Sequence, residues 1–202
     1  RLLKVVNVNA PVVSLNSNEF INSNIGYDIQ GLLHRAKSKC DVEQIATLQQ
    51  AGEQVPMYLW SPLFDYVLKN ASHIASCVRS ATFVIDGAPL PSKKDEIVLR
   101  KQTKAKLFAD AIKLEETDSA GARKKFAASI EVSIDSVRNA IIERLSSANL
   151  TIIQSPNEGD AQLAWLMKSD CVDLVFCNDS DLLLYGCERV IVVKSTNDPY
   201  TG

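Results

Sequence analysis

Four carboxylate side chains occur in two pairs, and each pair follows a short apolar segment. The first pair comes after residues 150–153 and the second after residues 172–176. Carboxylates that crowd together repel one another unless a cation lies among them. The pattern therefore predicts half of a metal-ion nuclease site. Its acids are Glu158, Asp160, Asp179 and Asp181.

Two further acids, Asp28 and Asp86, also stand where a predicted strand ends. In an open parallel sheet such strand ends converge on one crevice. Two Mg²⁺ ions about 4 Å apart suit phosphodiester hydrolysis, because one lowers the pKa of the attacking water and both stabilise the transition state. Hard oxygen ligands without neighbouring His or Cys favour Mg²⁺ or Mn²⁺ over Zn²⁺.

Each acid also has a purely structural interpretation. Ser155 stands three residues before Glu158, with Pro156 between them, and this spacing alone favours a helix capping box. Asp179 and Asp181 would suit an Asx turn or the first turn of a helix. These explanations must hold six times independently, at positions that an α/β sheet brings together, so we favour the metal site.

Basic residues are concentrated between residues 93 and 106, although the chain has 22 Lys+Arg against 24 Asp+Glu. Lys93 and Arg100 are two helical turns apart, and Lys104 extends the same face. Such cations can hold a scissile phosphate or stabilise its developing charge, and a solvated helix face is the alternative. Proximity to Asp86 favours the functional interpretation. The candidate nucleic-acid-binding residues are His34, Lys93, Lys94, Arg100 and Lys104.

His34 lies two turns after Asp28 on a predicted helix and could stack against an unpaired terminal base. A partly buried helical histidine with no such role is the alternative. Trp60, Trp165 and Phe176 lie within apolar periodicity, and we expect all three in the core.

The elements that must position these residues alternate along the chain. Apolar runs predict strands at 24–28, 81–85, 150–153 and 172–176, and helical periodicity covers 29–39 and 58–78. This alternation predicts an α/β fold with a mostly parallel sheet and helices on both faces. Between Asp86 and Leu150 the chain is helical, with a break at 117–121 and a second helix from about 131 to 146. We expect this insertion to project from the sheet.

Composition sets the broad class. A chain of 202 residues with 46% hydrophobic residues is long enough for one globular domain. Its five cysteines, odd in number and without a CxxC pair, favour free thiols in a reducing compartment. No apolar run approaches the length of a membrane span, so we expect no membrane partner. We also expect the natural chain to extend beyond both Arg1 and Gly202.

Several motifs of the sequence resemble those of a known family. Pro156-x-Glu-x-Asp-Ala-Gln-Leu-Ala-x-Leu and Asp179-Ser-Asp-Leu-Leu-x-Tyr-Gly-Cys, followed by Val190-Ile, resemble the internal region of flap endonuclease/XPG nucleases. Val84-Ile-Asp-Gly-x-x-Leu-Pro-Ser-Lys-Lys and Asp28-x-x-x-x-Leu-His-Arg resemble its N-terminal region, in particular that of the eukaryotic exonuclease 1 branch.

The resemblance implies a PIN-like fold with a two-metal site and a helical arch. It implies one catalytic domain over 1–202, with an N-terminal region 1–101, an arch and linker 102–147, and an internal nuclease region 148–202. Lys93 and Arg100 would engage the scissile phosphate, as catalytic residues together with Asp179, and His34 would stack near the 5′ end. The implied metal ligands are Asp28, Asp86, Glu158, Asp160, Asp179 and Asp181.

The implied activity is Mg²⁺-dependent hydrolysis of DNA, both as a 5′ to 3′ exonuclease and as a 5′ flap endonuclease, with Mn²⁺ able to substitute. The implied partners are DNA with 5′ ends, flaps or nicks, and repair proteins bound through regions outside this chain. The implied setting is DNA repair in the nucleus.

Three alternatives stay open at this stage. They are a non-catalytic relative that binds nucleic acid or protein, a replicative flap endonuclease, and an RNA-directed PIN-type nuclease. Asn178 departs from the family's usual glutamate and Gly159 from its alanine. The family's seventh aspartate and its helix-two-turn-helix would fall after Gly202.

Overall fold

The computed structural model describes residues 18–178 and 181–192, which form two compact units. The sheet unit contains residues 18–31, 68–88 and the described residues from 142 onward, and the helical unit contains 32–67 and 89–141. The single catalytic domain and its three regions stay a prediction.

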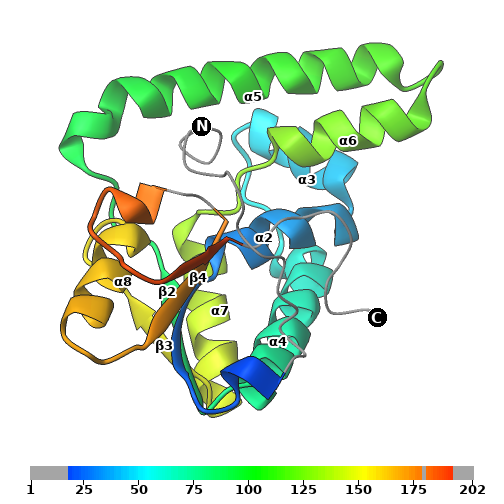
Figure 1. Cartoon of the computed structure of the whole chain (residues 1–202). Coiled ribbons are helices and arrows are strands. Elements are labelled where there is room, and N and C mark those ends of the chain that lie inside the picture. The colour runs from blue at the N-terminus through cyan, green and yellow to red at the C-terminus, as the bar shows by residue number, and fades with distance from the viewer. Residues whose placement is uncertain (1–17, 179–180, 193–202) are drawn as a thin grey trace. The chain divides into compact units, whose positions relative to one another are not determined.

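The sheet unit is built on five parallel strands (Figure 1). The order across the sheet is β3-β2-β1-β4-β5, so β1 lies at the centre between β2 and β4. This arrangement confirms the predicted parallel sheet and adds β5, which the apolar pattern did not predict. The strands are β1 (Asn24–Asp28), β2 (Ser80–Ile85), β3 (Thr151–Gln154), β4 (Leu174–Cys177) and β5 (Val190–Val192).

The central strands are apolar because the sheet is covered. All four residues of β4 are buried, as expected for a parallel strand with both faces packed. Phe176 of β4 stacks on Tyr27 of β1, with ring centroids 6.1 Å apart, and meets Phe20 edge-on at 5.4 Å. These contacts lock the register of β1 against β4 and confirm Phe176 as a core residue.

Helix α8 (Gly159–Lys168) packs on the sheet against β1, β2 and β4. It buries Leu163, Ala164 and Leu166. The prediction that Trp165 belongs to the core is wrong, because Trp165 is 58% exposed. The side chains that face the sheet are its neighbours in the helix, and Trp165 lies on the opposite side.

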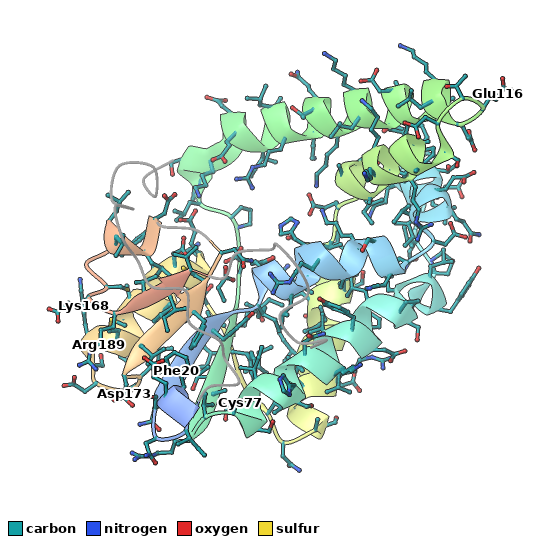
Figure 2. All side chains as sticks on the ribbon, turned by 45° about the vertical axis from the view of Figure 1, so that its right-hand side comes forward. Phe20, Cys77, Glu116, Lys168, Asp173 and Arg189 are labelled. Carbon is teal, nitrogen blue, oxygen red and sulfur yellow. The ribbon has the colours of Figure 1, made fainter. Side chains whose placement is uncertain are left out.

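The helical unit contains the insertion that follows β2. Helix α5 (Lys94–Leu114) is followed by α6 (Ser119–Ser129), and α6 packs against both α5 and α3 (Val42–Gln50). Glu116 lies in the turn between the two long helices (Figure 2). The predicted break at 117–121 is thus confirmed within three residues.

Three helices contain residues of both units, namely α2 (Gln30–Ala36), α4 (Ser61–Ser76) and α7 (Asp135–Ser147). Short 3-10 helices lie at Asn18–Phe20, Lys37–Lys39, Met57–Trp60, Pro91–Lys93 and Asp181–Leu183. Helix α2 with the 3-10 helix Lys37–Lys39 matches the helix predicted at 29–39. The 3-10 helix Met57–Trp60 with α4 matches the helix predicted at 58–78. Within the described ranges, no helix is long and apolar enough to cross a membrane.

Helix α7 begins later than predicted. Gln49 of α3 donates from Nε2 to the carbonyl oxygen of Glu131 at 2.8 Å, and its Oε1 accepts from the Glu131 N–H at 2.7 Å. This two-way bond consumes the backbone groups of Glu131 that a helix would need. The helix therefore starts at Asp135.

Candidate functional site

The acid-bearing ends of the strands lie at one edge of the sheet unit, because every strand pair is parallel. Asp28 pairs with Val84, and Ile85 pairs with Gln154, so Asp86 and the loop after β3 begin at the same level. The chain proceeds from β1 outward to β2 and β3, and then returns to the other side of β1 as β4. Open parallel sheets bind ligands at such a switch point.

Asp86 is held by the start of helix α8. Its Oδ1 accepts a hydrogen bond from the backbone N–H of Gly159, the first residue of α8, at 2.7 Å. The carboxylate also lies at the positive end of the helix dipole, which stabilises its charge. The structure thus brings Asp86 next to the turn that carries Glu158 and Asp160.

The capping box that we considered as the structural alternative for Ser155 and Glu158 does not form. Ser155 is 2% exposed, and its Oγ donates to the carbonyl of Asn157 at 2.6 Å and accepts from the N–H of Gly87 at 3.2 Å. Glu158 occupies the N-cap position of α8, where its side chain makes no capping bond. Its Oε2 instead accepts from the hydroxyl of Tyr185 at 3.2 Å.

Two loops, residues 86–88 and 155–159, are joined by backbone hydrogen bonds, and we call this pairing the loop clasp. The N–H of Gly87 donates to Asn157 O at 2.7 Å, and Ala88 N–H donates to Pro156 O at 3.2 Å. Asn157 Nδ2 returns a bond to Ala88 O at 3.0 Å. A Cβ at Gly87 would lie 1.9 Å from the carbonyl oxygen of Ser155, so only glycine permits this approach.

Sequence reasoning missed the loop clasp. Its only signal was the Asp86-Gly87 pair, which alone is typical of an ordinary turn. The clasp fixes the loop that carries Asp86 relative to the loop that carries Glu158.

The remaining predicted metal ligands differ in how the structure places them. Asp28 ends β1, and its Oδ1 accepts from the N–H of Gln30 at 2.9 Å, as in an Asx turn. Asp160 lies in the first turn of α8, and Asp181 is an exposed residue that opens a 3-10 helix. Asp179 lies outside the described residues.

The donor set suits a hard divalent cation, since it consists of carboxylates at a single sheet edge. Among the residues that the structure describes, no group of three or more His, Cys, Asp or Glu side chains could hold a metal ion. The convergence of all six carboxylates on two ions stays a prediction.

In the helical unit, the predicted cations lie at the start of α5. Lys93 directly precedes the helix, and Lys94 and Arg100 are exposed on it. Arg100 forms an ion pair with Glu96, one turn earlier, in which both side chains are largely exposed. Lys104 pairs with Glu131, and its side chain is only 24% exposed. Lys104 is therefore less available to a phosphate than the exposed Lys94 and Arg100.

His34 lies on the exposed side of α2 within the same unit. Loss of hydration around its ring lowers the pKa of His34 to about 4, and the cations Lys37, Lys104 and Arg100 add to this effect against Glu131. The ring is therefore neutral at pH 7 and suited to stacking on a base. Lys104 and Arg100 are thus close enough to His34 to lower its pKa.

A buried lysine, Lys37, supports this face. Its Nζ donates to the carbonyl of Ile130 at 3.1 Å. Burial lowers the pKa of Lys37 to about 8, with a further contribution from Lys104, while Glu131 acts in the opposite direction. Burial alone would raise the pKa of Glu131, but hydrogen bonds from Lys104 and the Ser133 N–H lower it. No pattern in the sequence predicted this cluster.

Comparison with known proteins supports the resemblance to the flap endonuclease/XPG family. The XPG I-region family model matches residues 149–199. Exonuclease 1 from Xenopus laevis is 30% identical over 169 residues, which are 83% of this chain and 22% of that protein. Flap endonuclease 1 from Methanothrix thermoacetophila is 30% identical over 186 residues, covering 83% of this chain and 54% of that protein.

The chain belongs to the flap endonuclease/XPG family. Exonuclease 1 proteins of Danio rerio and Arabidopsis thaliana also match, at 31% and 29% identity, in agreement with the resemblance to the exonuclease 1 branch. The chain spans about a fifth to a quarter of the length of these exonuclease 1 relatives.

Solved structures confirm the PIN-like fold of this family. The catalytic core of Rad2 in complex with a DNA substrate superimposes with a TM-score of 0.59 at 16% identity, covering 99% of this chain and 49% of that one. Human GEN1 in complex with Holliday junction DNA gives 0.58 at 16% identity, with coverages of 97% and 41%. At this identity the likeness concerns the fold alone.

Proposed function

We propose that this chain carries the nuclease centre of a structure-selective 5′ nuclease that hydrolyses DNA phosphodiesters with Mg²⁺. One observation carries the proposal. The loops after β1, β2, β3 and β4 all bear the family's carboxylates, and they leave the sheet at one edge, on both sides of the switch point between β1 and β4.

The chain's own carboxylates would hold two Mg²⁺ ions, which Mn²⁺ could replace. The metal ions would supply an activated water and stabilise the charge that develops on the phosphate. Asp86 and Glu158 contribute from loops that the clasp holds together, and Asp86 keeps one oxygen on Gly159. The ligands we propose are Asp28, Asp86, Glu158, Asp160, Asp179 and Asp181.

The helical unit would bind the DNA strand. Lys93 and Arg100 would engage the scissile phosphate, and Lys94 would contact the backbone as an exposed cation. His34, neutral at pH 7, would stack against a base near the 5′ end. Lys104 would exchange its partner Glu131 for a phosphate only at the cost of leaving Glu131 unpaired.

The exonuclease 1 relatives support a finer proposal. We propose 5′ to 3′ exonuclease and 5′ flap cleavage in DNA repair, in the nucleus, with repair-protein partners bound by regions outside this chain. A replicative flap endonuclease would favour flaps over recessed ends, and product mapping distinguishes the two.

The test is a cleavage assay on a duplex with a labelled 5′ flap and a recessed 5′ end, with and without Mg²⁺. We expect Mg²⁺-dependent release of mononucleotides or of the flap. Asp179→Asn should abolish cleavage, and Glu188→Gln, which changes an exposed acid, should leave it intact. DNA binding without cleavage by the unaltered chain would instead support a non-catalytic relative, and full turnover by Asp179→Asn would refute the site.

A further inference from the structure

The side-chain amide of Asn178 lies directly over the Cα of Gly31. A Cβ built on Gly31 would fall 1.5 Å from Nδ2 of Asn178, 2.4 Å from its Cγ and 2.7 Å from its Oδ1. All three distances are far below a van der Waals contact. A side chain at position 31 would therefore occupy the space that the amide fills.

This contact joins two acid-bearing turns of the sheet unit. Gly31 is in the first turn of α2, three residues after Asp28, and Asn178 is the last residue before Asp179. The strands that lead into these turns, β1 and β4, are neighbours, with Tyr27 opposite Phe176. The amide therefore lies at the switch point of the sheet.

We propose that Asn178, seated on Gly31, is a positioning residue that holds the end of β4 against the first turn of α2. The proposal rests on the proposed function, because the turn after β4 leads into Asp179 and Asp181. Strand β4 is buried at every residue, so the chain leaves the packed sheet at Asn178. Asn178 matters here because it is the first exposed residue after the strand.

The substitution Gly31→Ala tests this contact directly. Gly31 is not among the glycines with positive φ, and alanine favours a helix more than glycine, so the backbone of α2 tolerates the change. The three atoms nearest to the added methyl group all belong to the side chain of Asn178. The methyl group must therefore expel the amide and remove its contact with α2.

The experiment compares four forms of the chain: unaltered, Gly31→Ala, Asn178→Ala and the double variant. The readouts are kcat and KM for flap cleavage, Mn²⁺ affinity by loss of the free-ion EPR signal, and thermal unfolding. We expect Gly31→Ala to lower kcat about tenfold or more, with little change in KM, and to weaken Mn²⁺ binding. Asn178→Ala should lose less, and the double variant should recover to the level of Asn178→Ala.

A matched control combines Gly31→Ala with Asn139→Ala, which truncates an exposed asparagine of α7 and should restore nothing. Independent, additive losses in the double variant would overturn the proposal, as would Gly31→Ala with unaltered kcat and Mn²⁺ affinity. If the unaltered chain cleaves no DNA, the proposed function fails. The coupling between positions 31 and 178 in Mn²⁺ affinity and unfolding temperature then still decides the positioning contact.

Discussion

Asp86 Oδ1 lies 2.7 Å from the backbone nitrogen of Gly159 and accepts its hydrogen bond, so the first residue of the loop after β2 also caps helix α8. A metal ligand in this position would be oriented before any ion arrives. The two roles can be separated, because capping requires only an acceptor oxygen whereas cation binding requires the negative charge.

Asp86→Asn should therefore keep the fold and lose activity. The amide oxygen can still accept from Gly159, but the charge is gone, and we expect cleavage to fall about a thousandfold. Asp86→Ala should also lose about 1 kcal/mol of unfolding free energy, the usual worth of an N-cap. Single-turnover cleavage and urea unfolding measure the two effects. Equal destabilisation by both variants would contradict the capping role.

Ser155 is the buried centre of the loop clasp, with Oγ bonded to both Asn157 O and Gly87 N. Ser155→Ala should lower the unfolding free energy by about 1 kcal/mol, because it removes both hydrogen bonds of a buried hydroxyl while Gly87 N–H and Asn157 O stay bonded to each other. Cleavage should also fall, since the loop that carries Glu158 loses its anchor. Ser146→Ala, an exposed serine of α7, is the control. An unfolding curve for Ser155→Ala that overlays this control would refute the role of the clasp.

Lys93 and Lys94 are adjacent cations with different predicted roles. Lys93 directly precedes α5 and is half-buried, whereas Lys94 is exposed. Lys93→Ala should slow the single-turnover rate by about 10²-fold or more and change DNA affinity little. Lys94→Ala should weaken binding and reduce its salt dependence, with the rate at saturation unchanged. If both variants alter affinity alone, Lys93 is only a backbone contact.

The sheet was predictable from the sequence because its strands are apolar runs. Residues 81–85 and 172–176 match β2 and β4 closely, since parallel strands buried on both faces leave few polar positions. β5 escaped prediction because it has three half-buried residues and no alternation to detect. The placement of Asp28 and Asp86 at one edge followed from the parallel topology alone.

The errors came from contacts between residues far apart in the chain. Ser155 and Glu158 have the spacing of a capping box, but the partner that decides the role of Ser155 is Gly87, 68 residues earlier. The contact of Asn178 with Gly31 was hidden for the same reason. Trp165 is exposed because the side of α8 that packs on the sheet is set by the sheet contacts, and Trp165 lies on the other side.

Lys37 gives the protein a pH-dependent stability. It is buried, its Nζ donates to Ile130 O, and its charged neighbours are Lys104 and Glu131. Its pKa is lowered to about 8 in the folded protein, below the ordinary value of 10.5. Between these two values the unfolded chain binds more protons than the folded one, so the free energy of unfolding rises with pH across this window. The burial penalty is complete below pH 8.

Lys37→Met should remove this dependence. The unaltered chain should gain roughly 3 kcal/mol of unfolding free energy between pH 8 and 10.5 relative to the variant, whose buried side chain carries no charge. Urea unfolding at several pH values measures how much less stable the unaltered chain is than Lys37→Met. This deficit should be largest near pH 7 and shrink as the pH rises. Lys101→Met, at an exposed position of α5, is the control and should run parallel to the unaltered chain. Parallel curves for Lys37→Met as well would show that the Lys37 ammonium is not desolvated in the folded protein.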